Sequence, residues 1–255
     1  MPAALHPDFL RLPIAHRALH DRAAGRPENS RAAIRAAVAA GYAIEIDLQL
    51  SSDGMAMVFH DETLDRLTEA SGWVQDRSAA DLGAIPLRDA EDGIPSLAEV
   101  LAIVDGRVPL LIEVKDQTLV PGGLIGPLES ATAAALQGYA GPVALMSFNP
   151  DSVATLARLC PAIPRGLTTG SYDPESYAPL PPDLCDRLRG IPDYSRVGAS
   201  FISHEAADLA RPRVAELQAQ GAAVLCWTIR SPQAEAEARK IARNITFEGY
   251  LAAKA

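Results

Sequence analysis

Charged residues alternate with aliphatic ones in the segment 43–50, which reads AIEIDLQL. Because successive side chains of a strand point to opposite faces, Glu45 and Asp47 share one face of a predicted strand. Unpaired buried carboxylates cost much free energy, so this face needs a counter-charge. A predicted turn at 51–54 and a returning strand then lead to His60. We therefore predict a cation between the two acids, with a histidine nearby, in the active site of an enzyme.

A second predicted strand, 109–115, places Glu113 and Lys115 on one face. With Glu45 and Asp47, the new acid makes a ligand set of oxygens only. Hard oxygen ligands suit Mg²⁺ or Ca²⁺ better than zinc. Such a cation binds phosphate oxygens and draws charge away from phosphorus. The three acids thus predict a divalent-cation site that accepts a phosphate group.

Two histidines and two basic residues complete this set. Arg17 and Lys115 are candidates for a phosphate clamp, and His16 and His60 for a general acid and a general base. This is the equipment for cleaving a phosphodiester. Each residue alone also has an ordinary structural interpretation, as an ion pair or a buried histidine. Their shared position at predicted strand ends favours chemistry, and Trp227, at another strand end, is a candidate pocket wall.

Short apolar segments alternate with helical ones along the chain. The strands are predicted at 12–16, 43–50, 109–115, 142–147, 164–168, 197–203, 222–227 and 245–248. Helices are predicted at 30–40, 97–105, 124–137, 151–159, 183–188 and 205–220, and from 231 onward. This order predicts an α/β fold, a (β/α)₈ TIM barrel, as a single domain over residues 1–255, with its active site at the strand C-termini.

The end of the chain is too short for a full eighth repeat. Seven residues follow Glu248, so the eighth helix is predicted to be short or missing. We expect the N-terminal arm, residues 1–11, to cover the resulting gap.

Composition excludes several other functions. The net charge is −9, which argues against nucleic-acid binding and against stable association with anionic membranes. The three cysteines are far apart and form no CxxC pair, so a cysteine zinc site is not expected. No apolar run has the length of a signal-peptide core or of a membrane span. We expect a cytoplasmic protein, and the formation of a homo-oligomer stays open.

Motifs through most of the chain resemble those of the glycerophosphodiester phosphodiesterases. They agree in order and spacing as well as in residue type. The matching segments are AHR at 15–17, PENS at 27–30, EIDLQLSSDG at 45–54, VFHDETLDRLT at 58–68, IPSLAEVL at 94–101, LIEVK at 111–115, SF at 147–148 and WTI at 227–229.

The resemblance implies a (β/α)₈ barrel that hydrolyses a small glycerophosphodiester to glycerol 3-phosphate and an alcohol. It implies attack by the neighbouring glycerol hydroxyl and a cyclic phosphate that water then opens. The implied metal ligands are Glu45, Asp47 and Glu113; the implied acid/base pair is His16 and His60; the implied substrate contacts are Arg17, Lys115, Glu28, Asn29 and Trp227.

The sequence departs from the family pattern at three places. Ala18 stands where the family usually has Gly after His-Arg, and Ala adopts a positive φ only at a cost. The usual Thr-Asp near the C-terminus is replaced by Thr-Phe-Glu-Gly at 246–249, so the acid is Glu248. The segment between the second strand and Ile94 is short, which leaves little room for a cap over the glycerol pocket.

Two alternatives stay open on the sequence alone. A phospholipase-D-like barrel acting on lysophospholipids would need an apolar groove at the barrel mouth, for which Tyr172, Tyr177 and the Pro-rich run 179–182 are candidates. A non-catalytic barrel would have lost an acid or a histidine, and none is lost.

Overall fold

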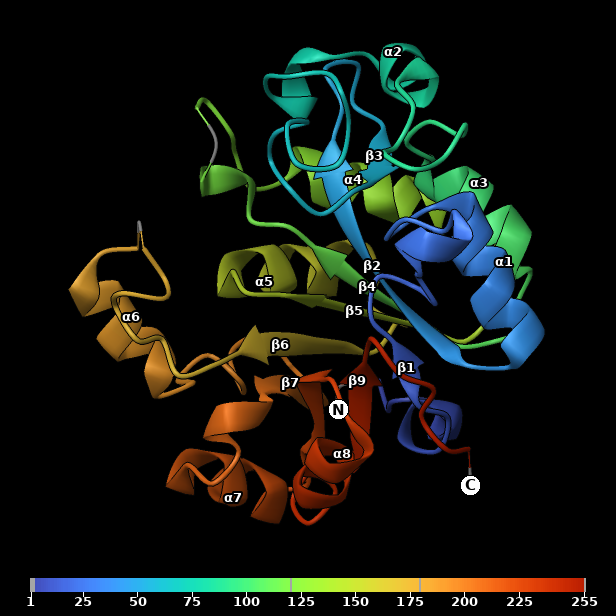
Figure 1. Ribbon diagram of the computed structural model, residues 1–255. Helices are drawn as coiled ribbons and strands as arrows, with labels where there is room; N and C mark the ends of the chain where they lie inside the picture. Colours follow the sequence, from blue (N-terminus) through green and yellow to red (C-terminus); the bar gives the residue numbers. More distant parts are fainter. Residues whose placement is uncertain (1–2, 120, 179, 255) are drawn as a thin grey trace.

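Parallel strands form a closed barrel in the computed structural model, which describes residues 3–119, 121–178 and 180–254 (Figure 1). The first barrel strand pairs with both the second and the last, and this pairing closes the sheet. Within the described residues, eight strands make the barrel: β1 (Ile14–Ala15), β2 (Ala43–Leu50), β4 (Leu110–Val114), β5 (Val143–Ser147), β6 (Arg165–Thr169), β7 (Phe201–Glu205), β8 (Ala223–Ile229) and β9 (Asn244–Phe247). The prediction of a TIM barrel is therefore confirmed.

A hairpin extends the barrel beside β2. Strand β3 (Ala56–Val58) runs antiparallel to β2, as the alternating sequence predicts. The segment that follows builds a separate apolar cluster around Phe59, Leu64 and Leu82. It includes the short helix α2 (Ala79–Ala84).

The helices lie outside the sheet, and several begin at recognisable capping residues. Ser30 caps the first helix, and Ser96 forms a capping box with Glu99, as predicted. The outer helices are α1 (Arg31–Ala40), α3 (Leu97–Val104), α4 (Pro127–Ala135), α5 (Pro150–Leu159), α6 (Pro182–Arg189), α7 (Pro212–Ala219) and α8 (Pro232–Ala238), with 3₁₀ turns at η1 (Pro7–Leu10), η2 (Arg22–Ala24), η3 (Val74–Asp76), η4 (Gln117–Leu119) and η5 (Ala206–Asp208).

Three elements begin three or more residues later than predicted. The helix predicted at 205–220 is broken, because Pro212 lacks an N–H and forces Arg211 into an extended conformation, so that α7 begins at the proline. The helix predicted from 124 begins only at Pro127. The strand predicted from 197 begins at Phe201, since Gly198 has φ +60° and ends a turn there.

The chain ends without a helix after β9 within the described residues, as predicted. The C-terminal segment packs near α1 instead, where Tyr42 donates a 2.7 Å hydrogen bond to the carbonyl of Ala252. The expectation that the N-terminal arm covers this gap is wrong. Phe9 is buried among inward-facing residues at the lower end of the barrel, and Asn244 donates a 2.8 Å hydrogen bond to its carbonyl.

The inward-facing side chains change from apolar to acidic along the barrel axis. Apolar side chains fill the lower end, where Phe9 packs with Ile14, Ala43 and Leu111. Two residues further along β2 and β4, the same faces carry carboxylates. Since the side-chain period is two, alternation alone brings these acids inward, toward the strand C-termini. Among the described helices, none has both the length and the apolar composition needed to cross a bilayer.

Candidate active site

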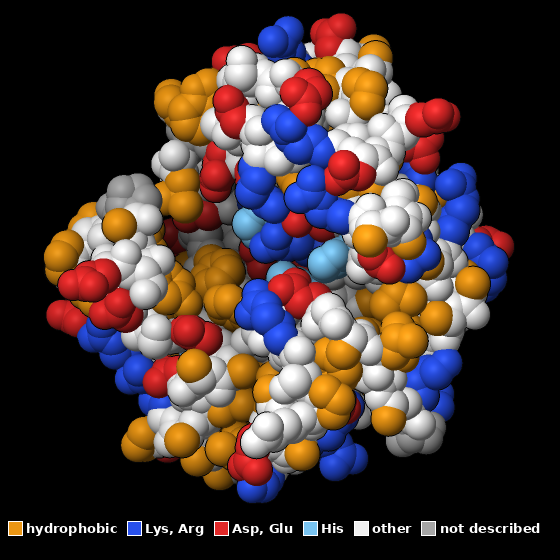
Figure 2. Space-filling view, viewed as in Figure 1, with side chains coloured by type: hydrophobic (Ala, Val, Ile, Leu, Met, Phe, Trp, Pro, Cys, Tyr) orange, Lys and Arg blue, Asp and Glu red, His pale blue; other side chains and the backbone are white. Residues whose placement is uncertain are grey.

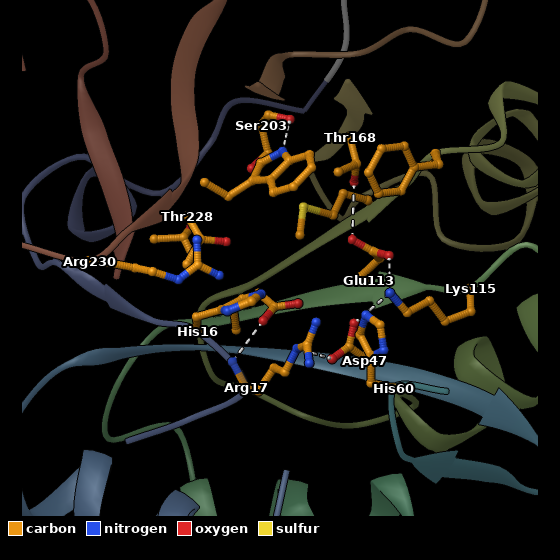
Figure 3. Close-up of a pocket in the computed structure, with 15 residues that line it drawn as sticks. His16, Arg17, Asp47, His60, Glu113, Lys115, Thr168, Ser203, Thr228 and Arg230 are labelled. Carbon is orange, nitrogen blue, oxygen red and sulfur yellow. Dashed lines mark hydrogen bonds and ion pairs between the residues drawn. The ribbon is translucent and has the colours of Figure 1, made fainter. Parts of the chain in front are cut away.

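Three buried carboxylates meet at the C-terminal end of the barrel. The parallel register pairs Asp47 on β2 with Glu113 on β4, and Glu45 lies one layer below on β2. One oxygen from each acid lies within 4.8 Å of the others. Lys115 bridges two of them, with its Nζ 2.8 Å from Asp47 Oδ1 and 2.6 Å from Glu113 Oε1 (Figure 3). Glu45 accepts a 2.9 Å hydrogen bond from the backbone N–H of Arg17.

The cluster holds more negative than positive charge at close range. Burial would raise the pKa of Asp47, but the charges of Lys115, His60 and Arg17 outweigh it and hold that pKa far below its usual range. Burial, followed by the charges of Asp47 and Glu113, raises the pKa of Glu45 well above the usual value. The hydrogen bond from the Arg17 N–H and the charge of Lys115 lower the pKa of Glu45 too little to compensate. A site that is rich in carboxylate oxygens and short of positive charge is compatible with a divalent cation.

The two candidate histidines lie on opposite sides of Arg17 (Figure 3). Each is held through Nδ1 by a carboxylate: Glu248 Oε2 lies 2.5 Å from His16, and Asp61 Oδ1 lies 2.7 Å from His60. Neither Nε2 has a hydrogen bond within the described part of the chain, and both rings line the same cavity. Burial lowers the pKa of His16, although the hydrogen bond that His16 donates to Glu248 opposes this shift. An anchored ring with a free Nε2 is suited to proton transfer.

Arg17 is fixed by an ion-pair network that extends to the second histidine. Its Nη1 donates to Glu28 Oε1 at 2.7 Å, and Glu28 accepts two hydrogen bonds of 2.9 Å from Arg66. Arg66 in turn binds Asp61, the partner of His60, at 2.6 and 2.7 Å. The network therefore ties the candidate phosphate-binding arginine to the candidate acid/base residue.

The departure at Ala18 is accommodated by the backbone. Arg17 and Ala18 have φ values of +50° and +65°, in the left-handed region that non-glycine residues rarely enter. The backbone N–H groups of these two residues then point to β2: one to the Glu45 carboxylate and the other to the Glu45 carbonyl, at 3.0 Å. The strained turn thus anchors the segment that carries His16 and Arg17.

A polar cavity of about 160 Å³ opens over these residues. Basic, acidic and histidine side chains gather at the centre of the face that Figure 2 shows. Trp227 forms part of the wall, with its indole N–H bonded to the carbonyl of Ser203 at 3.0 Å. Ser203 and Thr246 also line the cavity, and their hydroxyls are buried without a hydrogen-bond partner among the described residues.

Sequence and structure comparisons agree on the relationship of this chain. The sequence model described as "Glycerophosphoryl diester phosphodiesterase family" matches residues 16–247. The chain belongs to the glycerophosphoryl diester phosphodiesterase family. Among relatives, it is 32% identical to a glycerophosphodiester phosphodiesterase of Bacillus subtilis over 138 residues, which is 48% of this chain and 47% of the relative. It is also 32% identical to one from Caldanaerobacter subterraneus over 152 residues, 55% of this chain and 60% of the other. The matched regions thus span about half of these relatives.

Solved structures show the same fold over nearly the whole chain. A phosphodiesterase of Oleispira antarctica, in complex with the product sn-glycerol-3-phosphate, has a TM-score of 0.75 at 23% identity and covers 93% of both chains. A putative glycerophosphoryl diester phosphodiesterase of Silicibacter pomeroyi has a TM-score of 0.75 at 22% identity, covering 96% of this chain and 91% of the other.

The structure of this family member brings most of the predicted site residues together. Eight of them line the cavity: His16, Arg17, Glu45, Asp47, His60, Glu113, Lys115 and Trp227. Glu28 and Asn29 lie behind it. Glu28 holds Arg17, and Asn29 donates a 3.0 Å hydrogen bond to Asp47 Oδ2. A direct contact of these two residues with substrate stays a prediction.

Several further residues at the site were not assigned from the sequence. Glu248 could have been suspected as a site residue, because it is an acid at the end of the last strand. Its contact with His16 could not, because His16 lies at the other end of the chain. Arg66 and Arg230 are single basic residues in polar segments, with no local pattern to distinguish them. The buried hydroxyls of Ser203 and Thr246 follow from strand alternation, once the inward face is known.

Proposed function

We propose that this chain is an enzyme that hydrolyses glycerophosphodiesters to glycerol 3-phosphate and an alcohol. The observation that carries the proposal is the meeting of three buried acids, two anchored histidines and two basic side chains in one cavity. Family membership supports it, as does the sn-glycerol-3-phosphate bound in the related Oleispira antarctica phosphodiesterase.

Glu45, Asp47 and Glu113 would hold a divalent cation, Mg²⁺ or Ca²⁺. When bound, the ion would draw charge from the phosphoryl group through its oxygens. Arg17 and Lys115 bind the remaining phosphate oxygens, and the planar guanidinium suits two of them at once. Glu28 keeps Arg17 in place, and Asn29 orients Asp47.

The two histidines divide the proton transfers. His16 is held neutral by burial, so its Nε2 accepts the proton of the glyceryl hydroxyl next to the phosphate. That oxygen attacks phosphorus, the bond to the alcohol breaks, and protonated His60 donates its proton to the departing oxygen. Water then opens the cyclic phosphate, with the two proton transfers reversed.

The test is release of glycerol 3-phosphate from glycerophosphocholine and glycerophosphoethanolamine, with and without EDTA. We expect turnover that EDTA abolishes and that added Mg²⁺ or Ca²⁺ restores. His60→Ala should abolish turnover while the protein stays folded by circular dichroism. His6→Ala, at an exposed histidine of the N-terminal arm, is the matched control and should be fully active.

Two results would contradict the proposal: no release from any diester in the presence of either ion, or an unchanged kcat in the His60 variant. Lysophosphatidylcholine, added as a second substrate, addresses the phospholipase-D-like alternative. We expect it to be the poorer substrate.

A further inference from the structure

A second, larger cavity adjoins the proposed active site. It encloses about 690 Å³ and shares His60, Glu113, Lys115 and Phe148 with the first cavity. One wall comes from η4, after β4, and the opposite wall from α6 and the residues before it. In Figure 2 it is the hollow left of the centre, with hydrophobic side chains in its wall, and Figure 1 shows α6 standing away from the barrel on that side.

The walls of this cavity are largely apolar. Its lining includes Leu119, Phe148, Tyr172, Tyr177, Leu180 and Leu184. The tyrosine hydroxyls are already used by the protein: Tyr177 donates to Glu205 Oε2 at 3.3 Å, and Tyr172 donates to the carbonyl of Thr168 at 3.4 Å. The two rings lie 4.8 Å apart between centroids and pack with Phe148. Tyr172 is almost fully buried and supports the wall from behind, whereas the half-buried rings of Tyr177 and Phe148 offer apolar contact area.

Two basic side chains in the cavity wall are already paired with acids of the protein. Arg196 is paired with Asp151 at 2.9 Å, and Arg187 with Asp193 at 2.7 Å. These two arginines are thus already occupied, and they give an anionic ligand little reason to prefer the cavity. A cavity of this volume, whose exposed wall is mainly apolar and carries polar groups at its edges, is typical of sites for organic ligands.

The two cavities differ in what they can bind. The first is smaller, and charged, histidine and hydroxyl-bearing residues line it, so it suits a phosphate and the glyceryl hydroxyls. His16 lines only this first cavity, whereas His60 lies on the edge shared by both. A proton donor at this edge places the departing oxygen there, and the rest of the alcohol then extends into the second cavity.

We propose that the second cavity binds the leaving alcohol and that it selects an alcohol bearing an apolar chain or ring. This inference rests on the proposed diesterase function and on the role of His60 in it. Selection follows from burial, because each methylene that leaves water on entering the cavity stabilises the bound substrate and the transition state.

A series of sn-glycero-3-phosphoalkanols with ethyl, butyl, hexyl and octyl leaving groups tests this directly, because the leaving oxygen is chemically the same in each. We expect kcat/KM to rise about three- to fourfold per added methylene until the cavity is filled. Two further substrates test what else the second cavity could bind. One is glycerophosphocholine, whose leaving alcohol is cationic, and the other is an ethyl diester that carries a butyl chain on its glyceryl group instead of on the leaving alcohol. Neither should match the hexyl diester.

Leu119 offers a variant with a matched control. It lines the cavity at 44% exposure, so Leu119→Gln should fold normally. Leu159, at the end of α5, is 43% exposed and does not line the cavity. We expect Leu119→Gln to lower the dependence of kcat/KM on chain length and to leave the ethyl diester unaffected, and Leu159→Gln to change neither.

Three results would overturn the inference while the proposed function stands: a rate independent of chain length, a better rate with the choline or glyceryl-side substrate, and an equal effect of the two leucine variants. If no diester of the series is hydrolysed, the proposed function itself fails, and the inference fails with it.

Discussion

Replacing Glu248 by Gln removes the charge that anchors His16 without changing the shape of the side chain. The carboxylate lies 2.5 Å from His16 Nδ1 on one side and 2.8 Å from Arg230 Nε on the other. An amide can still fill this space, but it cannot stabilise the imidazolium that forms when His16 accepts a proton. The loss should therefore be felt mainly during the proton transfer.

The expected size follows from the strength of such a contact. A hydrogen bond to a charged group contributes about 1.5–3 kcal/mol, which corresponds to a fall of about 10- to 150-fold in kcat/KM. The pH profile should shift as well. Glu248 raises the pKa of His16 against the effect of burial, so its removal lowers that pKa further. Because the base works in its neutral form, the fall of kcat/KM on the acid side of the pH profile should move to lower pH.

The assay is kcat/KM for glycerophosphoethanolamine between pH 4.5 and 9, with Glu248→Gln, Glu248→Asp and Glu237→Gln. Aspartate keeps the charge but is shorter by about 1.5 Å, one C–C bond, so we expect an intermediate loss with a smaller pH shift. Glu237 is an exposed acid on α8 and serves as the control. Unchanged kcat/KM and an unchanged acid limb in Glu248→Gln would refute this role.

Three further outcomes follow from the same geometry. In the wild-type chain, burial lowers the pKa of His16, so the midpoint of the fall in kcat/KM at low pH should lie below pH 6.5, the ordinary pKa of histidine. A midpoint above pH 6.5 would contradict the role of His16 as a neutral base. Arg66→Gln should lower kcat/KM about tenfold, and a double-mutant cycle with Glu28→Gln should be non-additive, since Arg66 holds Glu28 and Glu28 holds Arg17. Strict additivity would argue against the network. Phe9→Ala should lower the free energy of unfolding, measured with urea, by about 3–5 kcal/mol, because it leaves a cavity in the apolar cluster at the lower end of the barrel. A loss below about 1 kcal/mol would place Phe9 outside the core.

Local sequence patterns predict much of this fold because they act over a few residues. The alternation of β2 and β4 fixes which side chains face inward, and the parallel register then brings Asp47 beside Glu113. Capping residues such as Ser30 and Ser96 mark helix starts through hydrogen bonds within one turn. For these elements, the local preference and the final packing agree.

Features that depend on distant partners could not be predicted in the same way. The sequence offers no local reason for Glu248 to bind His16, or for Phe9 to fill the barrel rather than the gap beside β9. The second cavity likewise arises only when the α6 region packs opposite η4. Tyr172 and Tyr177, which the sequence offers as candidates for a groove, both line this cavity; of the Pro-rich run 179–182, residue 179 lies outside the described residues.

The central claim is that an ion held by Glu45, Asp47 and Glu113 is needed for hydrolysis. Calorimetric titration of Mg²⁺ and Ca²⁺ into metal-free protein, with turnover of glycerophosphoethanolamine measured at each ion concentration, tests it most directly. We predict one ion per chain, activity that rises in step with occupancy, and loss of both in Glu113→Gln. Full turnover by the metal-free protein, or unaltered ion binding in Glu113→Gln, would contradict the claim.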